Sequence, residues 1–160
     1  MKQEFPVRKS VRWNQFDYSS AGAYFITICT QHKTCLFSPV GADLVSARMV
    51  ASVFQSTIER FEGVESPISV LMPNHFHAII TFSKEDSKVT LSKIIQEFKS
   101  VSTLEYAKLV KANLAPAFDK QLWQRSFYDR VIRNDTEYSD IYNYIYNNPE
   151  SWKNDDLYKE

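Results

Sequence analysis

Two histidines separated by a single residue, His75 and His77, are the side chains of this sequence best placed to do chemistry together. They lie at the start of the apolar run HFHAIITF, which is typical of a β-strand. Because residues two apart on a strand project from the same face, both imidazoles would leave the strand side by side, as paired metal ligands do. A single His-x-His pair is common by chance, so the spacing alone leaves a metal site as a hypothesis.

A tyrosine and an asparagine near the end of the chain form a second candidate pair. Tyr144 and Asn148 lie four residues apart where a helix is predicted to end, so that a phenol and a carboxamide share one flank. The same spacing directs Tyr142 to the core and Tyr146 to the opposite flank. Amphipathic helices commonly carry tyrosines without a chemical role, so Tyr144 is either a nucleophile or an ordinary helix residue.

Seven segments must position these residues. They are predicted as strand, helix, strand, strand, helix, strand and helix over residues 23–30, 42–61, 68–72, 75–82, 91–109, 123–132 and 136–147. Pro67 is expected to precede the second strand, and Thr90 to cap a helix whose apolar stripe includes Leu104. This order predicts an α+β, ferredoxin-like antiparallel sheet with helices packed on one face, plus a C-terminal helix carrying the tyrosine. His75 and His77 would then point to the uncovered face of the sheet.

The composition is that of one globular domain spanning residues 1–160. Hydrophobic residues make up 44% and charged residues 24%, and the formal net charge is zero, which excludes wholesale disorder. No apolar run approaches the ~20 residues needed to cross a bilayer, so we expect no membrane partner and a cytoplasmic, nucleoid-associated location. A basic N-terminal arm (1–17) and an acidic tail (150–160) permit local anion binding without broad affinity for duplex DNA.

The order of these motifs is similar to that of a known family. MPNHFH followed by a helical YIYNNP resembles the single-tyrosine transposases of the HUH class, named for a His, a bulky hydrophobe and a His, and in particular the REP-associated tyrosine transposases. The resemblance covers nearly the whole chain, since it also includes DYSSAGAYFITICT, IIQEFKS and WQRSFYDRVIRN. Each motif is modest singly, but together and in this order they are specific.

The resemblance implies a role for each candidate residue. His75 and His77 match the metal ligands of the family, Asn148 matches a third, amide-type ligand, and Tyr144 matches the nucleophile. The implied cofactor is Mg²⁺ or Mn²⁺, and the implied partner is single-stranded or hairpin DNA. Cleavage would leave a 5′-phosphotyrosine on the enzyme and a free 3′-hydroxyl. The active form would be a monomer or a homodimer that exchanges the tyrosine helix.

Six basic residues are candidate DNA contacts: Arg8, Lys9, Arg12, Lys99, Arg125 and Arg130. Some members of the family have a longer basic C-terminal extension, whereas this chain continues past Pro149 with the acidic KNDDLYKE. Two alternatives therefore stay open: a catalytically idle hairpin DNA-binding protein of the same fold, and a structural Zn²⁺ site on the histidine pair with no nucleic acid.

Overall fold

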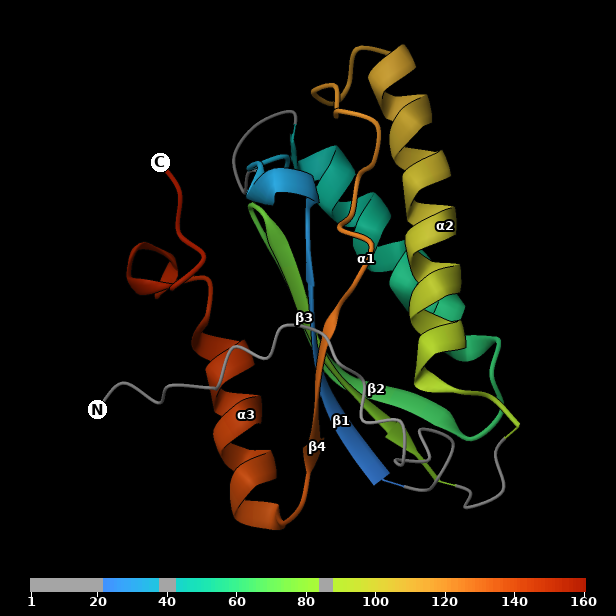
Figure 1. Cartoon of the computed structure of the whole chain (residues 1–160), viewed down its shortest axis with the longest axis vertical. Helices are drawn as coiled ribbons and strands as arrows, with labels where there is room; N and C mark the ends of the chain where they lie inside the picture. The colour runs from blue at the N-terminus through green and yellow to red at the C-terminus, as the bar shows by residue number, and fades with distance from the viewer. Residues whose placement is uncertain (1–21, 38–42, 84–87) are drawn as a thin grey trace.

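The chain folds into a four-stranded antiparallel sheet with helices on both faces (Figure 1). The computed structural model describes residues 22–37, 43–83 and 88–160. Its elements are β1 (Gly22–Cys29), η1 (Gln31–Lys33), α1 (Asp43–Glu59), β2 (Val64–Met72), β3 (His75–Phe82), α2 (Leu91–Lys111), β4 (Tyr128–Ile132), α3 (Asp135–Asn147) and η2 (Trp152–Asn154). The strand order β2-β3-β1-β4, with every pair antiparallel, confirms the predicted α+β, ferredoxin-like fold.

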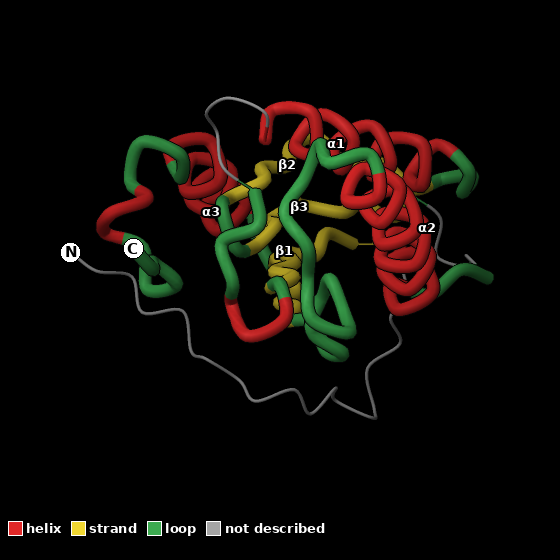
Figure 2. Tube along the Cα trace, turned by 90° about the horizontal axis from the view of Figure 1, so that it is seen from above, coloured by secondary structure: helices red, strands yellow, loops and turns green. Residues whose placement is uncertain are grey.

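The two faces of the sheet have different helical covers. Seen from above in Figure 2, α1 and α2 lie on one side of the strands and α3 lies on the other. The expectation that the histidine face stays uncovered is therefore wrong. Ile141 and Ile145 of α3 pack against Phe25 and Ile79 of the sheet, because both surfaces are apolar and lose water together.

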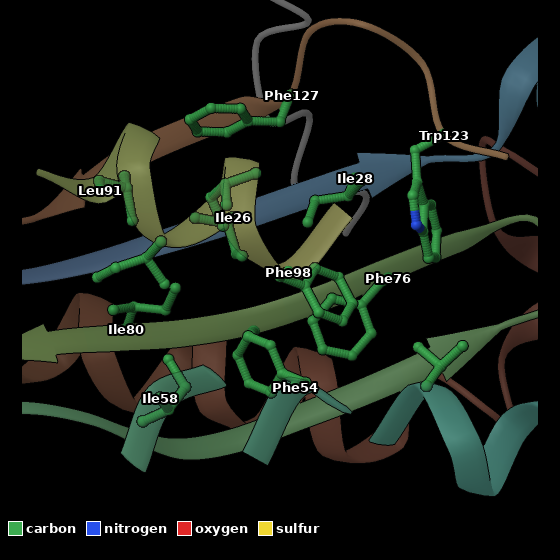
Figure 3. Close-up of a cluster of buried hydrophobic side chains, with 14 of the residues drawn as sticks. Ile26, Ile28, Phe54, Ile58, Phe76, Ile80, Leu91, Phe98, Trp123 and Phe127 are labelled. Carbon is green, nitrogen blue, oxygen red and sulfur yellow. The ribbon is translucent and has the colours of Figure 1, made fainter. Parts of the chain in front are cut away.

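The larger core lies between the sheet and the pair α1 and α2, as Figure 3 shows. Alternate residues of β3 enter it, as the strand period predicts: Phe76, Ala78, Ile80 and Phe82 are all buried. Phe54 of α1 and Phe98 of α2 meet Phe76, with ring centroids 4.7 and 5.1 Å from it. This core fixes β3, so the histidines between its apolar residues must face α3.

The second strand starts earlier than predicted. β2 begins at Val64 and runs through Pro67, whereas the sequence suggested that Pro67 precedes the strand. Proline lacks the N–H that a central strand must donate, but β2 lies at the edge of the sheet. The register between β2 and β3 shifts between Glu65 and Ile68, so the proline occupies an irregular stretch of an edge strand.

The buried stripe of α2 also differs from the predicted one. Leu104 is 64% exposed, while Ser102 and Tyr106 are fully buried. Both polar groups are satisfied: the Ser102 hydroxyl accepts from Trp123 Nε1 at 2.8 Å and the Tyr106 hydroxyl donates to Pro116 O at 3.0 Å. Tertiary hydrogen bonds thus override the apolar pattern at this end of the helix.

The fourth strand is shorter than residues 123–132. β4 covers only Tyr128–Ile132, and Trp123 instead forms an isolated bridge with Thr30 and enters the core.

None of the helices within the described residues has the length and apolarity to cross a membrane. The predicted basic arm at 1–17 lies outside the described residues.

Candidate metal and tyrosine site

Strand β3 presents its two histidines to α3. His75 is opposite Cys29 and His77 is opposite Thr27 on the neighbouring β1, so both imidazoles are at the centre of the sheet. Their ring centroids lie 4.5 Å apart. Neither ring is on an open face, because the exposed fractions of the two residues are 0% and 3%. Ordinary strand alternation thus delivers two adjacent buried imidazoles.

One nitrogen of each imidazole is used to hold its ring. His75 Nδ1 donates to Asn74 Oδ1 at 2.8 Å, and His77 Nδ1 lies 2.8 Å from Thr27 Oγ1. Both Nε2 atoms are buried and have no hydrogen-bond partner among the described residues. Burial lowers the pKa of His75 to about 4 and that of His77 well below its usual value, His77 being lowered also by its neighbour. The rings are therefore neutral near pH 7.

The N-terminus of α3 is tied to the sheet. Asn134 caps the helix by accepting from the Glu137 backbone N–H at 2.9 Å, and the Glu137 carboxylate accepts in return from the Arg133 backbone N–H at 2.8 Å. Glu137 also forms an ion pair with Arg130 of β4. These contacts fix where α3 starts, and the helix period then sets where Tyr144 lies.

Tyr144 reaches the histidine pair from α3 of the same chain. Its ring centroid lies 5.5 Å from that of His77 and 6.1 Å from that of Phe25. Tyr146 is 72% exposed, which agrees with its predicted place on the opposite flank. Asn148, which follows α3, is 2% exposed, and its Oδ1 has no hydrogen-bond partner among the described residues. The sequence pairs His75–His77 and Tyr144–Asn148 are thus neighbours in space.

Asp155 is a further member of this site that the sequence interpretation missed. Its Oδ2 accepts from Asn148 Nδ2 at 3.3 Å and lies 3.7 Å from His75 Nε2. One donor atom from each of His75, His77 and Asp155 lies within 4.8 Å of the others. The sequence offered only one signal, a carboxylate soon after the tyrosine helix, and an acidic tail is usually a solvated surface.

The phenol of Tyr144 is held in its neutral form. Burial, and after it the Asp155 carboxylate, raise the pKa of Tyr144 to about 12, although a hydrogen bond from Asn148 opposes them. In these surroundings the phenol gives up its proton less readily than a free tyrosine does. A positive charge beside the phenolic oxygen would reverse this effect.

The donor set fits a divalent cation. The two Nε2 atoms and Asn148 Oδ1 are buried acceptors with no partner in the described part of the chain, and each such atom costs about 1–3 kcal/mol if nothing binds it. Two imidazole nitrogens, an amide oxygen and a carboxylate oxygen are ligands of Mn²⁺, Zn²⁺ and, through the oxygens, Mg²⁺. A metal ion held by the histidine pair would satisfy both Nε2 atoms at once.

Two of the three predicted DNA contacts within the described residues already have protein partners. Lys99 Nζ donates to the carbonyls of Gln124 and Ser126 at 2.8 and 3.0 Å, so its charge already stabilises the segment before β4. Arg130 is paired with Glu137, while Arg125 is exposed. The remaining candidates, Arg8, Lys9 and Arg12, lie outside the described residues.

Comparison with known sequences finds similarity over nearly the whole chain. The family model described as "Transposase IS200 like" matches residues 23–148. A Haemophilus influenzae protein described only as uncharacterised is 30% identical over an alignment of length 174, which covers 94% of this chain and 93% of the relative. A second H. influenzae protein, assigned by inference as a REP-associated tyrosine transposase, is 25% identical over 136 residues, covering 83% of this chain and 73% of the relative.

Solved structures share the fold. A REP-associated tyrosine transposase bound to a REP hairpin matches with a TM-score of 0.62 and 21% identity, over 89% of this chain and 74% of that one. A Deinococcus radiodurans protein assigned by inference as a transposase matches with a TM-score of 0.55 and 15% identity, over 88% of this chain and 97% of that one. At sequence identities of 21% and 15%, these matches establish a shared fold.

Proposed function

Because this chain belongs to the family of IS200-like transposases, we propose that it is a metal-dependent single-stranded DNA endonuclease and strand transferase that cuts at hairpins through a phosphotyrosine. The observation that carries the proposal is the convergence, within one chain, of a phenol on the buried histidine pair, with Tyr144 and His77 rings 5.5 Å apart. An ordinary helix tyrosine has no reason to lie against a buried imidazole whose Nε2 has no partner among the described residues.

In the proposed reaction Tyr144 is the nucleophile. Its Oη attacks the scissile phosphorus, the bond to the 3′ oxygen breaks, and the 5′ phosphate stays on the tyrosine as a phosphodiester. The phenolic proton leaves to solvent, and the departing 3′ oxygen takes a proton to become a free hydroxyl. The ester keeps the energy of the broken bond, so attack by a 3′-hydroxyl can rejoin strands and regenerate the phenol.

His75, His77 and Asn148 are the proposed ligands of Mg²⁺ or Mn²⁺. All three side chains are neutral near pH 7, and each has a buried acceptor without a partner among the described residues. When bound, the cation supplies positive charge to the phosphate and to the developing phenolate. Asn74 and Thr27 hold the imidazoles with the free nitrogens turned away from them.

Hairpin DNA is the proposed substrate. Its support is the likeness of fold to a REP-associated transposase bound to a REP hairpin. Arg125 is an exposed candidate contact, while Arg130 and Lys99 would have to exchange their present partners for phosphates. Because Tyr144 lies against His77 of its own chain, a monomer would contain a whole site, and the exchanged dimer is not needed for chemistry.

The test is adduct formation. Purified protein is incubated with Mn²⁺ and a 5′- or 3′-labelled hairpin oligonucleotide, and a protein–DNA adduct that survives denaturation is expected on the 5′-phosphate side. Tyr144→Phe should abolish it, whereas Tyr146→Phe, on the exposed flank two residues away, should leave it intact. An unchanged adduct in Tyr144→Phe would show that another group attacks. Tight hairpin binding without an adduct in any divalent metal would support the idle DNA-binding protein instead.

A further inference from the structure

The segment after α3 folds back against the histidine pair. At the upper left of Figure 1 it continues from the end of α3 through η2 beside the sheet. The Trp152 ring lies 5.9 Å from that of His75, and Tyr158 packs on Trp152 at 5.2 Å. We call residues 151–159 the C-terminal segment.

Polar contacts fasten the C-terminal segment to two loops of the body. Asn74, in the turn between β2 and β3, donates through Nδ2 to Leu157 O at 2.7 Å. Lys159 Nζ donates to His32 O of η1 at 2.7 Å. The side chain of Asn74 therefore contacts the segment through its amide nitrogen and His75 through its oxygen. The segment and the metal site share a partner.

The Asp155 side chain is almost fully buried, unlike a typical acidic side chain of a surface tail. Its side chain is 3% exposed, and Oδ1 accepts from the Leu157 backbone N–H at 2.7 Å, which aims the carboxylate inward. Oδ2 meets Asn148 Nδ2 at 3.3 Å, a long hydrogen bond, and faces His75 Nε2. Among the described residues, Asp155 comes within ion-pair distance of that imidazole and of no lysine or arginine. A carboxylate buried this deeply without a lysine or arginine partner is costly.

We propose that Asp155 is a ligand of the same divalent cation as His75 and His77, and that the cation thereby fastens the C-terminal segment to the sheet. The inference rests on the metal site of the proposed function. It changes the nature of that site, because the ligand set gains one negative charge and a hard oxygen. It also makes docking of residues 151–159 and metal binding one coupled equilibrium.

The strength of the coupling between segment docking and metal binding can be estimated. By reciprocity, the factor by which the docked segment tightens metal binding equals the factor by which the metal stabilises the docked segment. Removing even an outer partner of a metal ligand weakens affinity roughly 10- to 100-fold, so losing a direct carboxylate ligand is expected to cost at least that. Opening of the segment should therefore become roughly 10- to 100-fold rarer when the metal saturates the protein.

The first measurement is calorimetric titration of the metal-free full chain with Mn²⁺. Asp155→Asn keeps the shape and the acceptor for Leu157, and it should raise Kd by about 10- to 100-fold. Asp156→Asn removes the same charge from the exposed neighbouring residue and should leave Kd within about twofold. Circular dichroism confirms that each variant is folded.

The second measurement is limited trypsin cleavage after Lys153, an exposed residue inside η2. Cleavage there requires the segment to open, so saturating Mn²⁺ should slow cleavage of the native chain. The expected factor is the ratio of the Kd of Asp155→Asn to the Kd of the native chain. In Asp155→Asn, Mn²⁺ should give almost no protection. Equal Kd values, or binding without protection, would overturn the inference.

A third variant separates this inference from the proposed function. His77→Ala removes a ligand that both share, and it should abolish Mn²⁺ binding. If His77→Ala loses binding while Asp155→Asn binds as the native chain does, the inference fails and the proposed metal site stands. If the native chain itself does not bind Mn²⁺, the proposed function fails.

Discussion

Added Mn²⁺ should stabilise the folded chain, because only the folded state brings the histidines and Asn148 together. Their three buried acceptors are unpartnered in the described structure, and each unsatisfied group costs about 1–3 kcal/mol. Metal binding would recover part of this. A ligand at 100 times its Kd that binds only the folded state adds about 2.7 kcal/mol to the free energy of unfolding.

The corresponding rise in midpoint temperature is measurable. A chain of this size shifts by about 2–4 °C for each kcal/mol, so Mn²⁺ should raise Tm by roughly 5–11 °C over the same protein in EDTA. Differential scanning calorimetry of metal-stripped protein gives the difference directly. Comparing each variant with and without metal cancels the stability that a substitution itself removes.

His77→Ala and His32→Ala make a matched pair. His77 is buried beside Tyr144, whereas the His32 side chain in η1 is 66% exposed. The metal-dependent rise should vanish in His77→Ala and persist in His32→Ala. An equal rise in both would mean that Mn²⁺ stabilises the fold from elsewhere, and the interpretation of the orphaned acceptors would be wrong.

Two further predictions concern the elements that position the site. The Arg133 backbone N–H, more than the neighbouring arginine charges, lowers the pKa of Glu137 from 4.5. The folded state therefore favours the carboxylate, and its stabilising effect is full above about pH 4.5 and is lost as the pH falls through the lowered pKa. Glu137→Gln should be destabilising in urea at pH 7, and its penalty should shrink as the pH is lowered below 4.5. A penalty independent of pH would contradict this. Ser102→Ala should cost about 1–3 kcal/mol in urea, because the buried indole N–H of Trp123 loses its acceptor, whereas Ser100→Ala, on the exposed side of the same helix, should cost little. Equal effects at the two serines would show that helix propensity alone is responsible.

The sequence determined the elements and the chemistry of individual side chains. Strand period alone places His75 and His77 on one face and Phe76 and Ala78 on the other, and both faces are observed. Helix period likewise separates Tyr144 from the exposed Tyr146. Such patterns are local, so a short stretch of chain suffices to predict them.

Other features depended on residues far apart in the chain. Whether Ser102 or Leu104 faces the core is decided by Trp123, which needs an acceptor for its indole N–H. Pro67 fits within a strand because β2 is at the edge of the sheet, a property of strand order rather than of the proline's neighbours. No periodicity carries this information.

The candidate site likewise depends both on local sequence patterns and on long-range packing. The sequence supplied two histidines, a tyrosine and an asparagine of suitable chemistry, but α3 had to cross the histidine face before they could meet. Asp155 looked like one charge of a solvated tail, and only folding of residues 151–159 against the sheet buries it beside His75. Burial and the convergence of ligands arise from long-range packing, and for that reason the tertiary structure alone decided them.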